Sequence, residues 1–372
     1  MRFPEFSGEW EEHTLSEYLE FKNGLNPDAK RIGSGLPFIS VMDILSEGVI
    51  NYDNIRGKVN ATEKEIECFG VKDGDLLFQR SSETLEDVGR ANVYMDNRTA
   101  IYGGFVIRGR KIGNYDPLFF KYLLATPLAR KRTCRMGAGA QHFNIGQEGL
   151  SKISLYFPSI EEQRKIAGFL SLIDERIATQ NKIIEKLQSL IKGIAQHCIK
   201  ESTSGNTYVK LGDICQITTG KLDANAQVDN GIYPFFTCAE QPFKIDSFAF
   251  DTEALLISGN GANLGYINYY HGKFNAYQRT YVLDIFSENI QYIKWALKVL
   301  LPKRIAIEKS SSNTPYIVLS TLSDLRLPIP NKSIQCHIAK LMQSLERKLS
   351  SQIALNGSYN RLKQYLLRQM FI

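Results

Sequence analysis

The segment PSIEEQRKIAGFLSLIDERI, residues 158–177, decides the organisation of this chain, because a related segment, PNKSIQCHIAKLMQSLERKL, stands at residues 330–349. A shift of 172 positions aligns Pro158 with Pro330 and Gln163 with Gln335. A period of this length is far longer than the roughly 20–50 residues of a solenoid repeat. The sequence therefore predicts two copies of a larger unit, each made of a globular body and the long helix that follows it.

Each copy opens a long run of mostly apolar side chains spaced alternately three and four positions apart, which is typical of a coiled-coil seam. About forty helical residues would make each helix about 60 Å long. We expect the two helices to pair antiparallel, with Gln180 opposite residues 352–356 as a polar layer. The alternative is that each helix packs on its own body. In the second helix, Leu362 and Tyr365 could shift the stripe by one position. The predicted seam consists of Ile166, Leu170, Ile173, Ile177, Gln180, Ile184, Leu187, Ile338, Met342, Leu345, Leu349 and Gln352.

The two bodies also resemble each other. Gly24 aligns with Gly220 at a shift of 196, and GDLLFQRSS (74–82) matches TEALLISGNGANLG (252–265) as a strand followed by a small polar loop. Because the second body is shorter, we expect it to lack residues from loops such as 80–100. The predicted fold class is α+β, with two similar globular domains separated by two long helices that form an antiparallel coiled coil with pseudo-twofold symmetry. The predicted boundaries are 1–158 for the first domain, 159–200 for the central helix, 201–330 for the second domain and 331–372 for the C-terminal helix.

Composition limits the class of protein. A chain of 372 residues with 43% hydrophobic and 23% charged side chains is long enough for two or three ordinary globular domains. No run approaches the eighteen or so apolar residues of a membrane span, and no signal peptide is recognisable, so we expect a cytoplasmic protein without a membrane partner. The six cysteines form no CxxC pair, which favours a reducing compartment. Of the net charge of +6, the segment 331–372 holds seven basic residues and one acidic residue, so both bodies are close to neutral.

Two loop motifs look like cofactor-binding sites but lack their context. GNGANLG (259–265) follows a predicted strand, but its G-x-G-x-x-x-G spacing and the absence of a following helix favour a tight turn over a dinucleotide site. NTPY (313–316) is similar to the Asn-Pro-Pro-Tyr of amino-methyltransferases, but no glycine-rich cofactor loop stands upstream. Asp28 and Lys30 lack the second acidic strand that a nuclease metal site needs, and no Walker A motif exists. We therefore predict no catalytic residue in this chain.

The chain contains two pairs of adjacent histidine and cysteine residues. Antiparallel helices would bring His197 and Cys198 close to Cys336 and His337, and these side chains could in principle bind zinc. A cysteine packed in the seam as a small apolar side chain is the simpler interpretation. We predict no metal site.

Polar side chains gather in glycine- and serine-rich loops at matching places in both bodies. Arginine pairs with guanine and asparagine or glutamine with adenine in the major groove, whereas hydroxyls and backbone N–H groups bind phosphates. The recurrence of these residue types favours DNA binding over solvated loops. The candidate DNA-binding residues of the first body are Lys22, Asn23, Gln79, Arg80, Ser81, Ser82, Arg135, Gln141, His142 and Asn144. Those of the second body are Lys221, Ser258, Asn260, Asn263, Gln278, Arg279, Lys309, Ser310 and Asn313.

This layout resembles the DNA-specificity subunit of type I restriction-modification systems over essentially the whole chain. The resemblance depends on the RFPEF…W opening, the GDLLFQRSS and EALLISGNGANLG blocks, and the helix start IEEQRKIAGFLSLIDERI. It implies two target-recognition domains that each read one half of a bipartite double-stranded DNA target, and helices that dock two methylation subunits. The second helix start, SIQCHIAKLM, departs from the first, which affects the details of docking at that end.

The resemblance implies a non-catalytic adaptor. It would join a restriction and translocation subunit through the methylation subunits, and S-adenosylmethionine, ATP and Mg would be bound by those partners rather than by this chain. Two readers on a stiff rod of about 60 Å could address DNA segments more than one helical turn, about 34–36 Å, apart. The alternative is a degenerate or fused DNA adenine methyltransferase that acts itself through NTPY.

Overall fold

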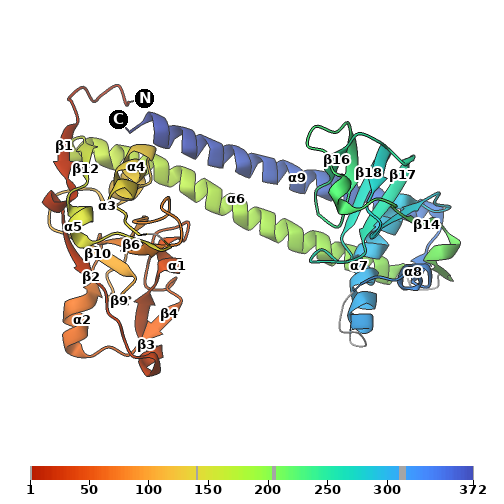
Figure 1. Ribbon diagram of the computed structural model, residues 1–372, viewed down its shortest axis with the longest axis horizontal. Coiled ribbons are helices and arrows are strands. Elements are labelled where there is room, and N and C mark those ends of the chain that lie inside the picture. The colour runs from red at the N-terminus through yellow and green to blue at the C-terminus, as the bar shows by residue number, and fades with distance from the viewer. Residues whose placement is uncertain (1, 140, 203–206, 310–315, 372) are drawn as a thin grey trace. The chain divides into compact units, whose positions relative to one another are not determined.

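The computed structural model describes residues 2–139, 141–202, 207–309 and 316–371 (Figure 1). Its contacts divide the chain into two compact units: unit 1 comprises Met1–Asn181 and Ala354–Ile372, and unit 2 comprises Lys182–Ile353. The long helices are α6 (Ile160–Glu201) and α9 (Lys332–Gln369). Their ends lie within a few residues of the expected boundaries. However, the compact units cut through both helices instead of leaving them as separate regions, because each half of a helix packs on the body beside it.

Unit 1 is built from small sheets and short helices. The strands β1 (Glu11–Thr14) and β12 (Ser154–Phe157) pair antiparallel. One four-stranded sheet has the order β2 (Leu19–Asn23), β10 (Val106–Lys111), β6 (Leu76–Gln79), β8 (Ala91–Val93), and the other has the order β4 (Gly57–Val59), β3 (Ile32–Ile39), β9 (Ala100–Tyr102), β5 (Gly70–Val71). A short ribbon joins β7 (Ser81–Ser82) to β11 (Phe143–Asn144). The helices are α1 (Val41–Ile44), α2 (Glu63–Phe69), α3 (Pro117–Leu124), α4 (Pro127–Arg135), α5 (Gln147–Ser151) and the 3₁₀ turns η1 (Leu15–Glu17) and η2 (Ala29–Arg31).

Unit 2 repeats this plan around one larger sheet. The strands β13 (Thr207–Lys210) and β20 (Arg326–Ile329) pair antiparallel, as β1 and β12 do. The six-stranded sheet has the order β14 (Gln216–Thr219), β19 (Thr280–Asp284), β17 (Phe250–Ser258), β18 (Ile267–Ala276), β15 (Tyr233–Phe236), β16 (Phe243–Ile245). The helices are α7 (Ile290–Lys309), α8 (Leu319–Ser323) and the 3₁₀ turns η3 (Leu211–Asp213) and η4 (Ala224–Ala226). Two similar α+β units and two long helices confirm the predicted fold class.

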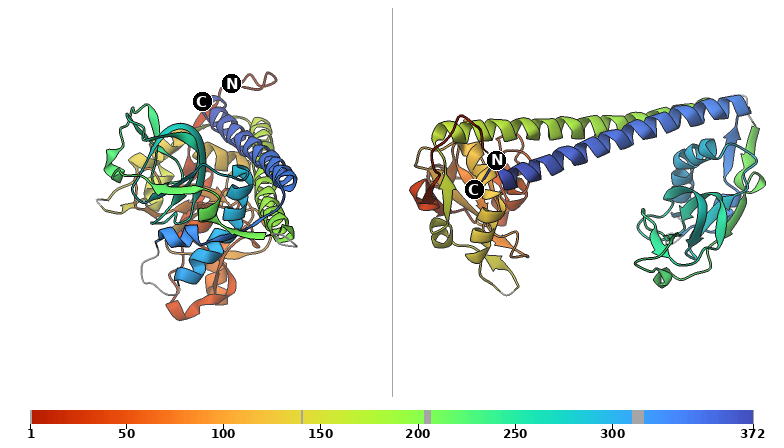
Figure 2. Two further views of the ribbon diagram at one scale, coloured as in Figure 1. Left: turned by 90° about the vertical axis from the view of Figure 1, so that its right-hand side faces the viewer. Right: turned by 90° about the horizontal axis from the view of Figure 1, so that it is seen from above.

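The long helices run antiparallel where they meet inside each unit. In unit 1, Asn356 donates from Nδ2 to Asn181 Oδ1 at 2.8 Å, and Lys363 Nζ lies 2.6 Å from Asp174 Oδ1. Residues further along α9 therefore contact residues earlier in α6, as antiparallel helices do. Figure 2 shows this pairing from two further directions. In unit 2, Leu187 and Ile191 of α6 share one apolar cluster with Ile338 and Met342 of α9.

The expected seam residues all lie at buried or half-buried positions on the two helices. The predicted pairing holds inside each unit, and the seam also merges with the core of each body, because each half of a long helix packs on the body beside it and not each whole helix on one body. Ile166, Leu170 and Leu366 belong to one apolar cluster with the aromatic core of unit 1. Leu362 and Tyr365 are exposed, so the stripe does not shift toward them; the buried side chains there are Leu366, Leu367 and Met370. Gln180 is buried beside the Asn181–Asn356 bond, which forms a polar layer in unit 1.

The repeated glutamine has the same role at the start of both long helices. Gln163 Oε1 accepts a hydrogen bond from the Asp116 N–H at 3.1 Å, and its Nε2 donates to the Pro158 carbonyl at 3.0 Å. Gln335 makes the matching bonds to Asn289 at 3.0 Å and Pro330 at 2.8 Å. Asp116 and Asn289 are the N-caps of α3 and α7. Each glutamine thus fastens the start of a short helix to the start of a long one.

A repeated glycine marks where two backbones approach closely in each unit. A Cβ on Gly24 would lie 2.1 Å from the Gly103 carbonyl oxygen, and one on Gly220 would lie 1.9 Å from that of Ala276. Only glycine fits such a crossing. The expectation that the second body lost residues from loops such as 80–100 was wrong. The units differ mainly between Gly24 and β6, where unit 1 has α1, α2 and β5 in addition, while β4 on β3 matches β16 on β15.

Candidate nucleic-acid interface

In unit 1, three chain segments bring candidate side chains together next to the β7–β11 ribbon. The Arg80 N–H donates to the Phe105 carbonyl at 2.9 Å, and the Ile145 N–H donates to the Arg80 carbonyl at 3.0 Å. Arg80 Nη1 reaches the Gly104 carbonyl at 3.3 Å, and the Ser81 hydroxyl hydrogen-bonds Asn144 Oδ1. This cluster, which we call reading loop 1, joins residues 80–82, 103–105 and 141–145.

Reading loop 1 leaves several predicted side chains open to a ligand. Gln141, His142 and Asn144 are exposed, as is Arg135 at the end of α4. The Ser82 hydroxyl accepts a hydrogen bond from the Thr84 N–H, which shapes the turn that follows β7.

The other candidates of unit 1 occupy supporting positions. Gln79 is buried and donates from Nε2 to the Ser81 carbonyl at 2.9 Å, so it holds the loop from beneath. Lys22 turns its ammonium group toward Cys68 Sγ at 2.9 Å and the Phe69 ring at 5.5 Å, which favours a structural role over a phosphate contact. Asn23, at the end of β2, is exposed. All four residues of β6 are buried, which places Gln79 beneath the loop, whereas Lys22 and Asn23 stand at the more exposed end of β2.

Unit 2 assembles a corresponding cluster, reading loop 2, from residues 221–222, 238, 259–263 and 277–279. The Gly259 N–H donates to the Arg279 carbonyl at 2.8 Å, and the Gln278 N–H donates to the Leu222 carbonyl at 2.9 Å. Asn263 Nδ2 donates to the Cys238 carbonyl at 3.0 Å. These backbone and amide contacts hold the four segments of the cluster together.

The predicted side chains of unit 2 differ in how far they reach the surface. Lys221, Gln278 and Arg279 are exposed, and Asn260 is half-buried. Ser258 is only 2% exposed and supports the loop rather than facing a ligand. Ser310, Asn313 and the side chain of Lys309 lie outside the described residues.

The charge of these loops is not neutralised locally. Within the described ranges, Arg80, Arg135, Lys221 and Arg279 take part in no ion pair with an acidic side chain. An unpaired guanidinium on a loop is free to bind phosphate or a guanine edge.

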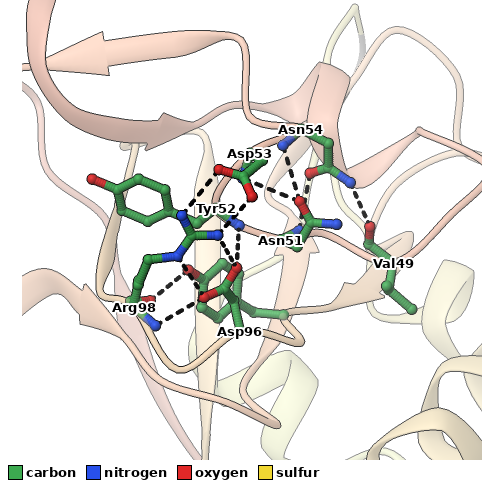
Figure 3. A network of polar contacts seen from close by, with 8 residues as sticks. Val49, Asn51, Tyr52, Asp53, Asn54, Asp96 and Arg98 are labelled. Carbon is green, nitrogen blue, oxygen red and sulfur yellow. Dashed lines mark hydrogen bonds and ion pairs between the residues drawn. The ribbon is translucent and has the colours of Figure 1, made fainter.

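Arg98, in contrast, is a basic residue whose charge is fully paired with acidic side chains. Its guanidinium forms ion pairs with Asp53 at 2.7 Å and Asp96 at 2.9 Å and lies 4.3 Å from the Tyr52 ring (Figure 3). The Arg98 hydrogen bonds lower the pKa of both carboxyl groups. The network fastens the turn of residues 51–54 to the segment around Arg98, and it leaves no free positive charge for a ligand.

A second feature, which the sequence analysis missed, is an apolar stripe on the exposed side of both long helices. On α6 it includes Phe169, Leu172, Ile183 and Leu190, and on α9 it includes Leu341, Leu355, Leu362 and Tyr365. The shift of 172 aligns Phe169 with Leu341, Arg176 with Lys348, Ile183 with Leu355, and Leu190 with Leu362. We call this set the outer stripe. The seven-residue spacing of the four aligned pairs, parallel to the seam, was the signal that could have revealed the stripe.

The motifs set aside from the sequence have simple structural roles. GNGANLG forms the turn between β17 and β18, with positive φ at Gly261 and Gly265, as interpreted. Most of NTPY lies outside the described residues. Among the described side chains, no cluster of three or more His, Cys, Asp or Glu could hold a metal ion. No described helix is long and apolar enough to cross a membrane.

Two α+β units of one plan each carry a loop cluster of basic and amide side chains, and its basic members form no ion pair among the described residues; this arrangement is typical of a DNA-recognition protein. The chain belongs to the family described as the type I restriction modification DNA specificity domain, which matches residues 7–189 and 203–356. The resemblance seen in the sequence is thereby confirmed.

Individual relatives agree with this assignment. The EcoDI specificity subunit of Escherichia coli is 42% identical over 143 residues, which cover 38% of this chain and 32% of that protein. The MjaIX specificity subunit of Methanocaldococcus jannaschii is 22% identical over 92% of this chain and 88% of that one. The crystal structure of the type I S subunit from M. genitalium has a TM-score of 0.65 at 18% identity and covers 98% of this chain and 96% of that chain, so it shares the fold.

Proposed function

We propose that this chain reads a bipartite DNA target, with reading loop 1 contacting one half-site and reading loop 2 the other. The observation that carries the proposal is that equivalent backbone positions in the two units present different side chains. Arg80 follows β6 in unit 1, whereas Gly259 follows β17 in unit 2, and both N–H groups bond to the turn opposite. Two sites of one design with unlike side chains predict two unlike half-sites.

The long helices would set the gap between the half-sites. α6 and α9 each continue from one unit into the other, so the number of helical residues fixes the length of the connection. Adding one heptad to both helices, after Gln180 and before Gln352, keeps the seam in phase and adds about 10 Å. At about 3.4 Å per base pair, the unread gap should lengthen by about three base pairs. An unchanged gap would contradict a spacer role.

The outer stripe would dock the methylation subunits. The same pattern, three apolar side chains and one basic side chain at seven-residue intervals, recurs on both helices, so two identical partners can bind equivalent surfaces. Replacing Ile183 and Leu355 by Asp should weaken assembly in a pull-down with the methylation subunit. Arg347→Asp, on an exposed position of α9 outside the stripe, is the matched control. Equal loss in both variants would argue against a specific surface.

The chain itself would be non-catalytic and would work in the cytoplasm within a larger complex. S-adenosylmethionine, ATP and Mg would be bound by the methylation and restriction subunits. The rival, a methyltransferase that acts through NTPY, predicts that the isolated chain binds S-adenosylmethionine in equilibrium dialysis. The proposal predicts no such binding.

Mapping methylated sites in cells that carry the assembled complex tests the central proposal. The expected result is one sequence with two different specified halves and an unspecified gap. If Arg279 contacts a guanine, Arg279→Ala should weaken binding by about 1–3 kcal/mol on targets that carry guanine at that position. The affinity for targets with another base there should stay unchanged. An equal loss on every sequence would identify Arg279 as a phosphate contact. A single continuous target would refute the two-reader arrangement.

A further inference from the structure

Backbone contacts show which residues of the two reading loops are equivalent. The Arg80 N–H bonds to the Phe105 carbonyl, and the Gly259 N–H bonds to the Arg279 carbonyl. The residue after Phe105, Val106, bonds back to the Gly103 carbonyl at 2.9 Å. In unit 2, Thr280 bonds back to Tyr277 at 2.8 Å in the same way. Phe105 therefore occupies the position in unit 1 that Arg279 occupies in unit 2.

The position is unusual for a phenylalanine. Phe105 is 68% exposed, more than any other aromatic side chain among the described residues. It stands on the turn that receives Arg80, whose guanidinium bonds to the neighbouring Gly104 carbonyl. A ring and a guanidinium thus share one short turn. The ring is not needed for packing, because its surface faces outward.

An apolar pocket of about 440 Å³ lies directly beside this turn. Its walls include Leu25, Ile32, Phe38 and Met42, and Phe105 forms part of its rim. Ile32 and Met42 are themselves largely exposed, so the pocket is open to a ligand that approaches reading loop 1. Gly104, whose carbonyl accepts the hydrogen bond from Arg80, also lines the pocket, so the site suits an occupant that presents an apolar group next to polar ones.

We propose that Phe105 reads a thymine of the first half-site, through contact with its 5-methyl group, beside a base contacted by Arg80. Thymine is the one base whose major-groove edge carries an apolar group, and it carries this group next to hydrogen-bonding atoms. This inference rests on the proposed function and specifies one of its contacts. It assigns base recognition in unit 1 to an Arg–Phe pair, whereas the matching pair in unit 2 is Gly–Arg.

The test uses the full chain assembled with its methylation subunits, because that is the form that binds the target. Each thymine of the first half-site is replaced in turn by deoxyuridine, which lacks only the methyl group, and binding is measured by fluorescence anisotropy at fixed salt. Burial of one methyl group corresponds to about fourfold in affinity. One replacement should weaken the wild-type complex by about fourfold, and the same replacement should not affect Phe105→Ala.

The control is Ile112→Ala, since Ile112 is an exposed apolar residue just past the other end of β10. This variant should keep the wild-type sensitivity to deoxyuridine. A first half-site without thymine, or a sensitivity that persists in Phe105→Ala, overturns the inference. A loss of affinity in Phe105→Ala that is equal on all sequences also overturns it, because it would mean that the Phe105 ring inserts between bases without reading one of them. A wild-type complex with no sequence preference would instead overturn the proposed function.

Discussion

The glutamine at the start of α6 offers a direct test of how the unit is held together. Gln163 is buried, and Gln163→Ala removes both of its hydrogen bonds. The Pro158 carbonyl is buried and would lose this partner, while the Asp116 N–H is half-buried. A buried polar group without a partner costs about 1–3 kcal/mol, and a partly solvated one costs less. We expect Gln163→Ala to lower the free energy of unfolding of unit 1 by about 2–4 kcal/mol.

The two tryptophans make the measurement specific to one unit. Trp10 lies in the core of unit 1, and Trp295 lies in the core of unit 2. In a Trp295→Phe background the fluorescence of Trp10 reports the urea unfolding of unit 1, and in a Trp10→Phe background Trp295 reports that of unit 2. Separate signals are needed because a chain with two units need not unfold in one step. Gln163→Ala should shift the Trp10 transition, and Gln335→Ala should shift the Trp295 transition.

The control for this prediction is Arg164→Ala, on an exposed position one residue further along α6. It should change the stability of unit 1 by no more than about 0.5 kcal/mol. The reasoning is refuted if Gln163→Ala behaves like Arg164→Ala. It is also refuted if Gln163→Ala lowers the Trp295 transition as much as the Trp10 transition.

Three further outcomes follow from the same contacts. Leu170→Ala, at a fully buried seam position, should destabilise unit 1 by about 2–5 kcal/mol in the Trp10 assay; Leu172→Ala, on the outer stripe, should be nearly neutral there. Arg31 lowers the pKa of Glu65 to about 2 from 4.5, so the stability that this ion pair gives is complete above pH 4.5 and is lost as the pH falls toward 2. Glu65→Gln should make acid unfolding of unit 1 less steep in that range, and an unchanged slope would contradict this. Burial raises the pKa of Cys215 to about 12, so brief thiol labelling at neutral pH, read by mass spectrometry, should modify exposed Cys336 and spare Cys215. Equal labelling of the two would contradict the buried position.

The sequence predicted the features that depend on local spacing. A heptad pattern specifies a helix face whatever surrounds it, so the seam around Leu170 and Met342 could be identified without coordinates. The repeated Gln163 and Gln335 were visible as a pattern, but their bonds to the caps of α3 and α7 were not, because those partners are about 46 residues away in the chain.

The features that depend on long-range pairing were out of reach. The segments 101–108 and 275–284 stand at matching places in the two bodies, but the equivalence of Phe105 and Arg279 follows only from the backbone bonds that distant strands make. Burial of Ser258 likewise depends on the face of β17 that meets the core. The outer stripe is a different case: its seven-residue period is present in the sequence, but it is shorter and less apolar than the seam beside it.

The chain passes from unit 1 into unit 2 and then returns to unit 1. Unit 2 is a single uninterrupted segment, Lys182–Ile353, whereas unit 1 is completed by residues from both sides of it. Asn181 and Asn356 hydrogen-bond each other, so the two cut ends of unit 1 are already neighbours. A helical hairpin needs only about two to five linking residues. A gene that lost the middle segment in frame, with such a turn in its place, would encode a half-sized reader with a single specificity.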